Sequence, residues 1–247
     1  MEHRYTTAAA HFDSLASEYD GLTDWTSHPE LLADVLSSVA KGPVLDVGAG
    51  PGTICDLLAG RLPARTLIIA LDCSPNMCRS SLRRGVRTVC GVGENLPLST
   101  GSLETIVCRQ ALHYLDVARA LPEWRRVLRQ GGTAILSQSA SDDLESTSWW
   151  TSVKSVVQPL RRSWLSCSDI ETLLTHHGMQ VTSCKTRWLL NRRSRSQFLV
   201  NSVLQEKDAM EALEEWQTSS PPSVAFSLKG DEVVFRQLWV TYQAVVV

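Results

Sequence analysis

The sequence predicts an α/β protein built on an open, mostly parallel sheet, and two observations support this prediction. Short apolar segments such as 43–47 and 104–110 alternate with segments of helical periodicity through the first half of the chain. Strands that are apolar throughout are typical of parallel strands buried on both faces. A ligand of such a sheet binds beyond the carboxyl ends of the strands. The loops expected to surround that crevice follow residues 47, 71, 91 and 109.

Each element of the first half has its own local signal. An amphipathic helix over 29–40 begins with a proline, and a second helix has Ser74 as its N-cap and Pro75 at its first position. The pair Gly131-Gly132 predicts the end of a helix over 116–129. The other expected elements are strands over 43–47, 65–72, 87–92, 104–110 and 133–139 and a helix over 53–61.

The second half is less regular. A helix over 168–177, a strand over 180–189 and a helix near 195–217 are expected, and alternation predicts a final strand over 231–247. The stretches 140–167 and 190–226 fall between sheet elements and hold four of the tryptophans.

Composition places the chain among ordinary globular proteins. A hydrophobic content of 43% and a charged content of 20% argue against disorder, and a net charge of −2 offers no general attraction for nucleic acid or anionic membrane. No apolar run approaches the ~20 residues that a spanning helix needs, and the first residues hold no apolar signal core. The 7 cysteines have no metal-like spacing. We therefore expect a cytoplasmic protein without disulfides or a metal site.

The segment PVLDVGAGPG, residues 43–52, runs an apolar strand into a loop with a glycine at every second position. Two adenosine ligands suit such a loop, a dinucleotide and S-adenosylmethionine. Pro51 removes one backbone donor, and Asp46 would repel a pyrophosphate. A carboxylate instead suits a ligand that carries an ammonium and a sulfonium. Electrostatics therefore favours S-adenosylmethionine.

A second carboxylate supports an adenosine ligand of either kind. Asp72 ends the second strand, one βαβ step after the glycine loop, where a carboxylate can accept both ribose hydroxyls. Its alternative role is to cap the following helix. Met77 is placed either to cover one face of the adenine or to fill the core.

Four ordered motifs carry a family resemblance: VLDVGAGPG, ALDCSPNM, GENLPLSTGSLETIVCRQALHYL and LPEWRRVLRQGGTAIL. Over about residues 10–190 the chain resembles class I S-adenosylmethionine-dependent methyltransferases, in the branch of the quinone-biosynthesis enzymes and the carrier-protein methyltransferase of biotin synthesis. The resemblance implies a Rossmann-like sheet of seven strands, the last one reversed, with helical lid insertions. It also implies one methyltransferase domain over 1–247, with an N-terminal lid over 1–28, a cofactor-binding half over 29–139 and substrate-lid insertions over 140–167 and 190–226.

The resemblance implies S-adenosylmethionine as cofactor, with its methionine part at Asp46 and the glycine loop and its ribose at Asp72. Val92 departs from the family, which usually has an aspartate there that binds the adenine amino group. Valine lacks this acceptor, and one lost hydrogen bond costs about 0.5–1.5 kcal/mol. The expected cofactor-binding residues are Tyr19, Asp46, Gly48, Ala49, Gly50, Gly52, Asp72, Cys73, Met77, Val92, Gly93, Glu94 and Arg109.

His113, just past the strand over 104–110, is the candidate catalytic base, and its alternatives are a pocket wall or a structural residue. A base is needed only when the acceptor keeps its proton at pH 7. Tyr19 lies in a segment that resembles the family's N-terminal lid, although an amphipathic helix packed on the sheet explains it equally well. The expected substrate-binding residues are Tyr19, Trp25, His28, His113, Tyr114, Trp149 and Trp164.

We therefore expect a methyltransferase that acts on a small molecule, aromatic or carrier-bound, in natural-product or cofactor biosynthesis. O-methylation is favoured, and N- and C-methylation stay open. The arginines of the segment 187–195 form either a solvated face or a contact for an anionic substrate. Two alternatives remain. One is a cofactor-binding protein that transfers no methyl, which Val92 keeps open, and the other is a nicotinamide-dependent reductase, which the loop spacing opposes.

Overall fold

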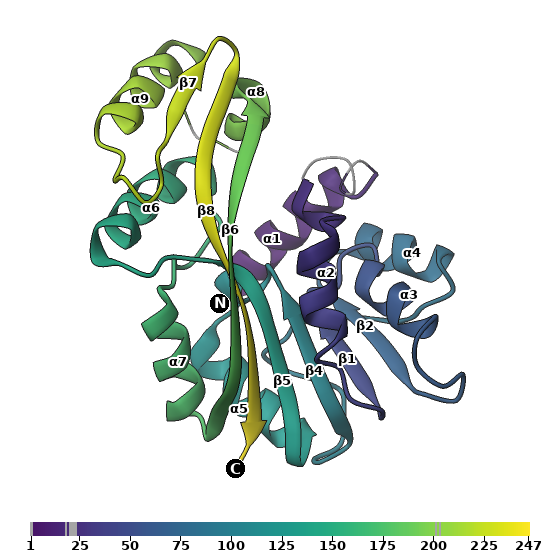
Figure 1. The fold of residues 1–247 in the computed structure, drawn as a ribbon. Helices are drawn as coiled ribbons and strands as arrows, with labels where there is room; N and C mark the ends of the chain where they lie inside the picture. Colours follow the sequence, from purple (N-terminus) through teal and green to yellow (C-terminus); the bar gives the residue numbers. More distant parts are fainter. Residues whose placement is uncertain (1, 18, 20–23, 201, 203) are drawn as a thin grey trace. The chain divides into compact units, whose positions relative to one another are not determined.

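The computed structural model describes residues 2–17, 19, 24–200, 202 and 204–247. Its sheet has the strand order β3-β2-β1-β4-β5-β8-β6, and the short β7 pairs with β8 off this path (Figure 1). This architecture confirms the predicted α/β class. The strands are β1 (Val44–Val47), β2 (Ile68–Asp72), β3 (Arg87–Cys90), β4 (Leu103–Arg109), β5 (Leu128–Ala140), β6 (Met179–Ser194), β7 (Ser227–Lys229) and β8 (Glu232–Val246).

The helices follow the strands in the alternation that the sequence predicts for the first half of the chain. Their bounds are α1 (Glu2–Leu15), α2 (Pro29–Leu36), α3 (Thr53–Ala59), α4 (Pro75–Arg83), α5 (Val117–Val127), α6 (Leu144–Val157), α7 (Cys167–His176), α8 (Arg195–Leu199) and α9 (Glu206–Thr218). Two short 3-10 helices, η2 (Asp24–Thr26) and η3 (Leu112–Tyr114), precede α2 and α5. Among the described residues, none of these helices combines the length and the apolarity that crossing a membrane requires.

The carboxyl ends of the central strands meet at one edge of the sheet. β1 is buried along its whole length and pairs in parallel with β2 on one side and with β4 on the other. The register aligns Val47, the last residue of β1, with Leu71 of β2 and Cys108 of β4. The loops that leave these three strands are therefore neighbours, as the sequence predicts for the crevice.

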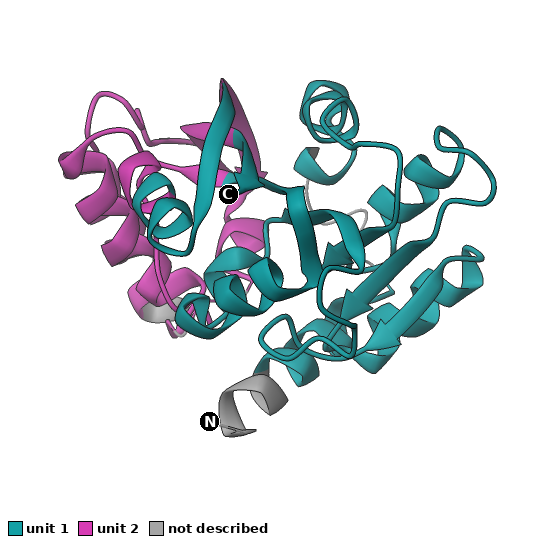
Figure 2. Cartoon of the chain, turned by 90° about the horizontal axis from the view of Figure 1, so that it is seen from below, with its two compact units in different colours: residues 1–138, 171–185, 241–247 teal, residues 139–170, 186–240 magenta. Residues whose placement is uncertain are grey.

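The chain forms two compact units, coloured separately in Figure 2. Unit 1 comprises residues 1–138, 171–185 and 241–247, and it holds β1 to β4. Unit 2 comprises residues 139–170 and 186–240, and it holds α6, α8, α9 and β7. The core of unit 2 is rich in aromatic side chains: Trp149, Trp150, Trp164, Phe198, Trp216, Phe226 and Phe235.

The pair Gly131-Gly132 lies inside a strand, which corrects the prediction that it ends a helix. α5 ends at Val127, and β5 begins directly after it. Gly131 has a φ of +72°, and the pairing of β4 with β5 shifts register after Leu103. A Cβ on Gly132 would lie 2.8 Å from the carbonyl oxygen of Arg129. The glycines therefore permit an irregular start of β5 that periodicity does not reveal.

The predicted helix near 195–217 is two helices, α8 and α9. After α8, the backbone N–H of Leu204 donates to the hydroxyl of Ser202 at 3.1 Å. A serine hydroxyl that bonds the nearby backbone competes with the helical ladder. The apolar residues on both sides of this interruption share one helical pattern, so the break is not visible in periodicity.

Candidate active site

The glycine loop between β1 and α3 lies directly on neighbouring backbone. The N–H groups of Gly48 and Ala49 both donate to the carbonyl oxygen of Leu71, at 2.8 and 3.0 Å. Gly48 has a φ of +69°, and a Cβ there would lie 2.4 Å from the Cβ of Ala111. Only glycine satisfies both conditions without strain. The loop thus presents bare backbone at the edge of the sheet where β1, β2 and β4 end.

Asp72 ends β2 and connects this loop to the helix α4. One carboxylate oxygen accepts the N–H of Gly50 at 2.8 Å, and the other accepts the N–H of Ser74 at 2.9 Å. The residue is 7% exposed. Burial raises the pKa of Asp72, and the two backbone N–H groups oppose this rise. The carboxylate is therefore held in a fixed orientation by donors from both sides.

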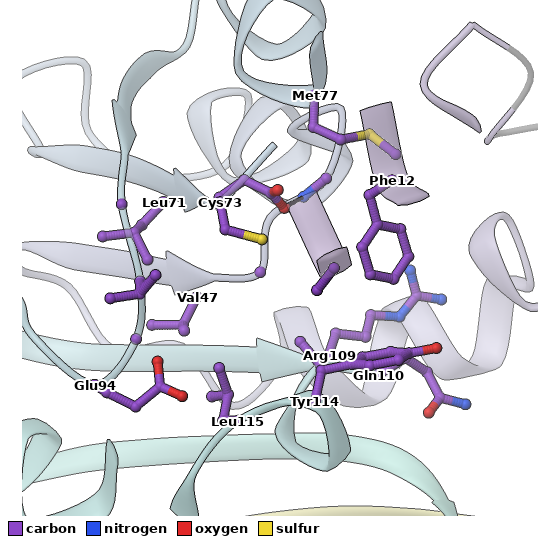
Figure 3. A pocket seen from close by; sticks show the side chains of 18 of the residues that line it. Phe12, Val47, Leu71, Cys73, Met77, Glu94, Arg109, Gln110, Tyr114 and Leu115 are labelled. Carbon is purple, nitrogen blue, oxygen red and sulfur yellow. Dashed lines mark hydrogen bonds between the residues drawn. The ribbon is translucent and has the colours of Figure 1, made fainter. Parts of the chain in front are cut away.

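A cavity of about 670 Å³, open to solvent, lies at this edge. Figure 3 shows Glu94 at one end of the cavity and Arg109 with Gln110 at the other. Its walls are largely apolar, which is typical of small-molecule sites. The lining residues are Ala8, Phe12, Tyr19, Val47, Gly48, Gly50, Leu71, Asp72, Cys73, Met77, Gly91, Val92, Gly93, Glu94, Arg109, Gln110, Ala111, Tyr114 and Leu115.

A second cavity, of about 380 Å³, shares Tyr19, Gly48, Gly50 and Arg109 with the first. It also contains Asp46, whose carboxylate is buried beside the thiol of Cys55. Burial raises the pKa of Asp46 to about 7; the positive charge of Arg109 opposes this shift, and the carboxylate of Asp72 adds to it. This cavity therefore contains a carboxylate that is stabilised mainly by one nearby cation.

Arg109 joins the end of β4 to the N-terminal segment. Its guanidinium donates to the carbonyl oxygen of Thr26 at 3.1 Å and to that of Trp25, and its central carbon lies 4.8 Å from the centroid of a Trp25 ring. Burial lowers the pKa of Arg109 to about 10, and Asp46 opposes this effect. The Nε atom is buried and has no hydrogen-bond partner in the part of the chain that the structure describes.

The raised pKa of Asp46 predicts how stability depends on pH. The pKa of Asp46 in the folded state, about 7, lies above the ordinary value of 3.8. The folded protein therefore binds the Asp46 proton more tightly than the unfolded chain does. The free energy of unfolding contributed by Asp46 therefore falls as pH rises between these values. Between pH 5 and pH 8, wild type should lose about 2–3 kcal/mol relative to Asp46→Asn.

Urea denaturation of both proteins at the two pH values measures this difference. Asp56→Asn, which changes an exposed carboxylate on α3, is the matched control and should leave the pH dependence unchanged. If the difference in free energy of unfolding between Asp46→Asn and wild type did not vary with pH, that result would contradict the raised pKa of Asp46.

Asp13 links α1 to the beginning of α4 through hydrogen bonds. Its carboxylate accepts the N–H of Asn76 at 2.8 Å and the hydroxyl of Ser74, and its carbonyl oxygen accepts the Asn76 side-chain amide at 3.2 Å. These contacts hold α1, and with it Phe12, against the first cavity. The hydrogen bond from Ser74 is the main cause of a lowered pKa of Asp13.

Asp13→Ala should therefore loosen α1 without unfolding the sheet. We expect faster amide hydrogen exchange over residues 8–15. We also expect about tenfold weaker binding of any ligand that Phe12 covers, because a loss of about 1.4 kcal/mol of binding free energy raises the dissociation constant tenfold. Hydrogen exchange followed by mass spectrometry and calorimetry check the two effects. Ser14→Ala, on the exposed side of the same helix, should change neither. Unchanged exchange in Asp13→Ala would show that α1 is held by other contacts.

Most of the sequence-predicted site residues converge on these two cavities. Five do not line either of them. Gly52 packs against Ser81, and His28 precedes α2 with its buried Nδ1 lacking a partner among the described residues. His113 is 3% exposed, and its ring centroid lies 4.4 Å from that of Tyr114, with the two ring planes tilted by 50°. Trp149 and Trp164 belong to the aromatic core of unit 2.

Several lining residues were not predicted from the sequence. Leu71, Ala111 and Leu115 are apolar residues that periodicity assigns to the core, and Ala8 lies on the expected lid helix. Gln110 carries a signal that only the structure shows, a φ of +54°, which is rare for a residue with a side chain. Such strain is concentrated at functional sites, and Gln110 follows directly after β4 at the cavity. Among the residues that the structure describes, no group of three His, Cys, Asp or Glu side chains is placed to hold a metal ion.

The family described as "Methyltransferase domain" matches residues 45–136, the segment that holds the glycine loop and Asp72. Residues 45–136 are therefore similar in sequence to methyltransferase domains. This finding confirms the resemblance to class I methyltransferases for that segment, and it includes most of the residues that line both cavities.

One similar protein is a malonyl-[acyl-carrier protein] O-methyltransferase of Herminiimonas arsenicoxydans, 34% identical over 140 residues. The aligned region is 55% of this chain and 54% of that protein. The chain therefore spans about half the length of the curated relatives it matches.

Solved structures share the fold of most of this chain. The YcgJ protein of Bacillus subtilis has a TM-score of 0.72 at 19% identity, over 88% of this chain and 98% of that one. Geranyl diphosphate C-methyltransferase from Streptomyces coelicolor, in complex with Mg²⁺, geranyl diphosphate and S-adenosyl-L-homocysteine, has a TM-score of 0.59 at 14% identity, over 90% of this chain and 77% of that one. At these identities the likeness establishes the fold.

Proposed function

We propose that this chain binds S-adenosylmethionine in the cavities of unit 1 and transfers its methyl group to a small-molecule acceptor. The observation that carries the proposal is Asp72, a buried carboxylate at the carboxyl end of β2 that lines the larger cavity. The N–H groups of Gly50 and Ser74 orient this carboxylate and use one lone pair on each oxygen. The remaining lone pairs are available to two ribose hydroxyls.

The other lining groups suit the remaining parts of the same molecule. Asp46 supplies a carboxylate for an ammonium, and the unpartnered Nε of Arg109 supplies a donor for a carboxylate. Val47, Leu71 and Leu115 offer apolar surface for an adenine ring. The complex of the Streptomyces coelicolor enzyme with S-adenosyl-L-homocysteine supports this choice of ligand.

When bound, S-adenosylmethionine supplies a methyl group on a positively charged sulfur that is readily displaced. The chain has to align the acceptor and exclude water. Phe12 and Tyr19 from the N-terminal segment and Tyr114 from η3 form walls of the cavity suited to this task. Because His113 lies outside the lining of both cavities, the site favours an acceptor that is already ionised at neutral pH.

A carboxylate is such an acceptor, and we propose O-methylation of a small carboxylic acid, free or bound to a carrier. The malonyl-[acyl-carrier protein] O-methyltransferase of Herminiimonas arsenicoxydans supports this acceptor class. A biosynthetic role and a cytoplasmic location remain predictions.

The alternative of a cofactor-binding protein without transfer keeps one observation in its favour. Val92 lines the larger cavity and has no side-chain acceptor for the adenine amino group. Losing that hydrogen bond weakens binding roughly tenfold, which leaves binding in place. Turnover, and not affinity, therefore separates the two functions.

The test uses S-adenosylmethionine labelled in its methyl group, with malonyl-carrier protein, free malonate and a phenol as acceptors. We expect label in a methyl ester of the malonyl group, and none with Asp72→Ala. Cofactor binding without label in any acceptor would favour the non-transferring protein. Absence of cofactor binding by wild type would overturn the proposed function.

A further inference from the structure

Glu94 is a buried carboxylate at the apolar end of the larger cavity. It is 6% exposed and lines that cavity together with Val47, Leu71 and Leu115. Figure 3 shows these four side chains at the end opposite Arg109. A buried carboxylate loses hydration and is stabilised by hydrogen-bond donors. A ligand that places an apolar ring at this end of the cavity therefore gains affinity if the edge of the ring donates to Glu94.

The turn that carries Glu94 is fixed by its protein neighbours. The backbone N–H of Asp116 donates to one oxygen of the Glu94 carboxylate at 2.7 Å, and the indole N–H of Trp124 donates to the carbonyl oxygen of Gly93 at 3.0 Å. A Cβ on Gly93 would lie 2.8 Å from the Cγ1 of Val47, so the turn packs directly on β1. The two oxygens of a carboxylate accept about four hydrogen bonds in all. Glu94 is thus a positioned acceptor with capacity for a further donor.

The larger cavity has two carboxylates among the described residues that line it, Asp72 and Glu94. Asp72 is oriented by two backbone N–H groups and is proposed to hold the ribose. Val92 lines the same cavity with an apolar side chain, so it offers no acceptor to a base. Arg109 and Gln110 lie at the opposite end (Figure 3). Glu94 is therefore the carboxylate that remains for a base attached to that ribose.

We propose that Glu94 accepts a hydrogen bond from the 6-amino group of adenine and makes the cavity select adenine over a 6-oxopurine. The inference rests on the proposed function, because it requires the adenosine part of S-adenosylmethionine in this cavity. Glu94 takes the task of the aspartate that the resembling family usually has at the position of Val92. An ionised carboxylate only accepts hydrogen bonds, so the carbonyl oxygen of a 6-oxopurine would meet it with repulsion.

Isothermal titration calorimetry of the full chain tests this role with two probes, S-adenosyl-L-homocysteine and S-inosyl-L-homocysteine. The second probe carries a carbonyl oxygen in place of the 6-amino group. Wild type should bind the adenosyl probe at least about tenfold more tightly than the inosyl probe. In Glu94→Gln the amide oxygen keeps the hydrogen bond from the N–H of Asp116, and the amide NH₂ replaces the other carboxylate oxygen. The preference should then fall to about threefold or less, or reverse, because this NH₂ donates to a carbonyl oxygen.

Glu123→Gln is the matched control, because the Glu123 carboxylate accepts the N–H of Leu96 at 2.8 Å and lines neither cavity. A variant that only loosens the segment around Glu94 weakens both probes equally, so Glu123→Gln should keep the wild-type preference. Val92→Asp provides a second test that leaves Glu94 in place. It should bring no gain in affinity for the adenosyl probe, because the amino group already has its acceptor.

The outcomes separate this inference from the proposed function. Three results would overturn the role of Glu94 while cofactor binding stands: equal binding of the two probes by wild type, an unchanged preference in Glu94→Gln, or an affinity gain of about tenfold in Val92→Asp. Binding of neither probe by wild type would overturn the proposed function together with this inference.

Discussion

Asp72→Ala should lower the affinity for S-adenosylmethionine and for its demethylated product at least about a hundredfold. The substitution removes the carboxylate proposed to accept two ribose hydroxyls, and hydrogen bonds to charged groups are each worth about 1.5–3 kcal/mol. A loss of about 3 kcal/mol corresponds to more than a hundredfold in the dissociation constant. It also releases the N–H groups of Gly50 and Ser74, so the glycine loop loses its connection to α4. Isothermal titration calorimetry of both ligands measures the effect.

Asp56→Ala is the control for this experiment, because Asp56 is an exposed carboxylate on the helix that follows the same loop. It should bind both ligands as wild type does. Asp72→Asn keeps the side-chain volume and should show a smaller loss of affinity. Wild-type affinity in a folded Asp72→Ala protein would show that the ribose is bound elsewhere.

Gly48→Ala should destabilise the protein by about 2–5 kcal/mol. Two costs combine in this figure: about 1–2 kcal/mol for a side chain in a left-handed conformation and about 1–3 kcal/mol for overpacking. The overpacking arises because the new Cβ would lie 2.4 Å from the Cβ of Ala111. Chemical denaturation gives the free energy of unfolding, and the same variant should bind S-adenosylmethionine more weakly because the loop moves.

The two costs can be separated by experiment. Gly85 has a φ of +77°, and a Cβ at this position would meet no described atom within 4 Å, so Gly85→Ala measures the conformational cost alone. Ala111→Gly removes the atom that Gly48→Ala would meet, so the double variant should recover the steric part. A double-mutant cycle with no coupling between residues 48 and 111 would show that the loop relaxes away from the contact.

The parallel half of the sheet and its carboxyl-end crevice are predictable from sequence because their determinants are local. The β1 strand is apolar apart from Asp46, and the glycine loop follows it without a gap. Asp72 is identifiable for the same reason, since it stands at the end of the next strand. Ser74 is confirmed as the N-cap of α4, where its hydroxyl accepts the N–H of Met77 at 3.1 Å.

Contacts between distant segments were not predictable in this way. Asp13 meets Ser74 across 61 positions of sequence, and nothing in the local pattern of α1 indicates that contact. Gly131 resembles a helix stop because the same left-handed conformation serves both a helix end and a strand irregularity. Trp149 and Trp164 resemble binding aromatics because composition does not distinguish a core tryptophan from one in a pocket.

The division of residues between the two units has a consequence for protein engineering. Both cavities described above are lined entirely by residues of unit 1, whereas the aromatic core that holds Trp149 and Trp164 belongs to unit 2. A library confined to residues 139–170 and 186–240 therefore alters no residue that lines either cavity. The aromatic core of unit 2 can be varied in that library while the residues proposed to hold the cofactor and the acceptor keep their wild-type identity.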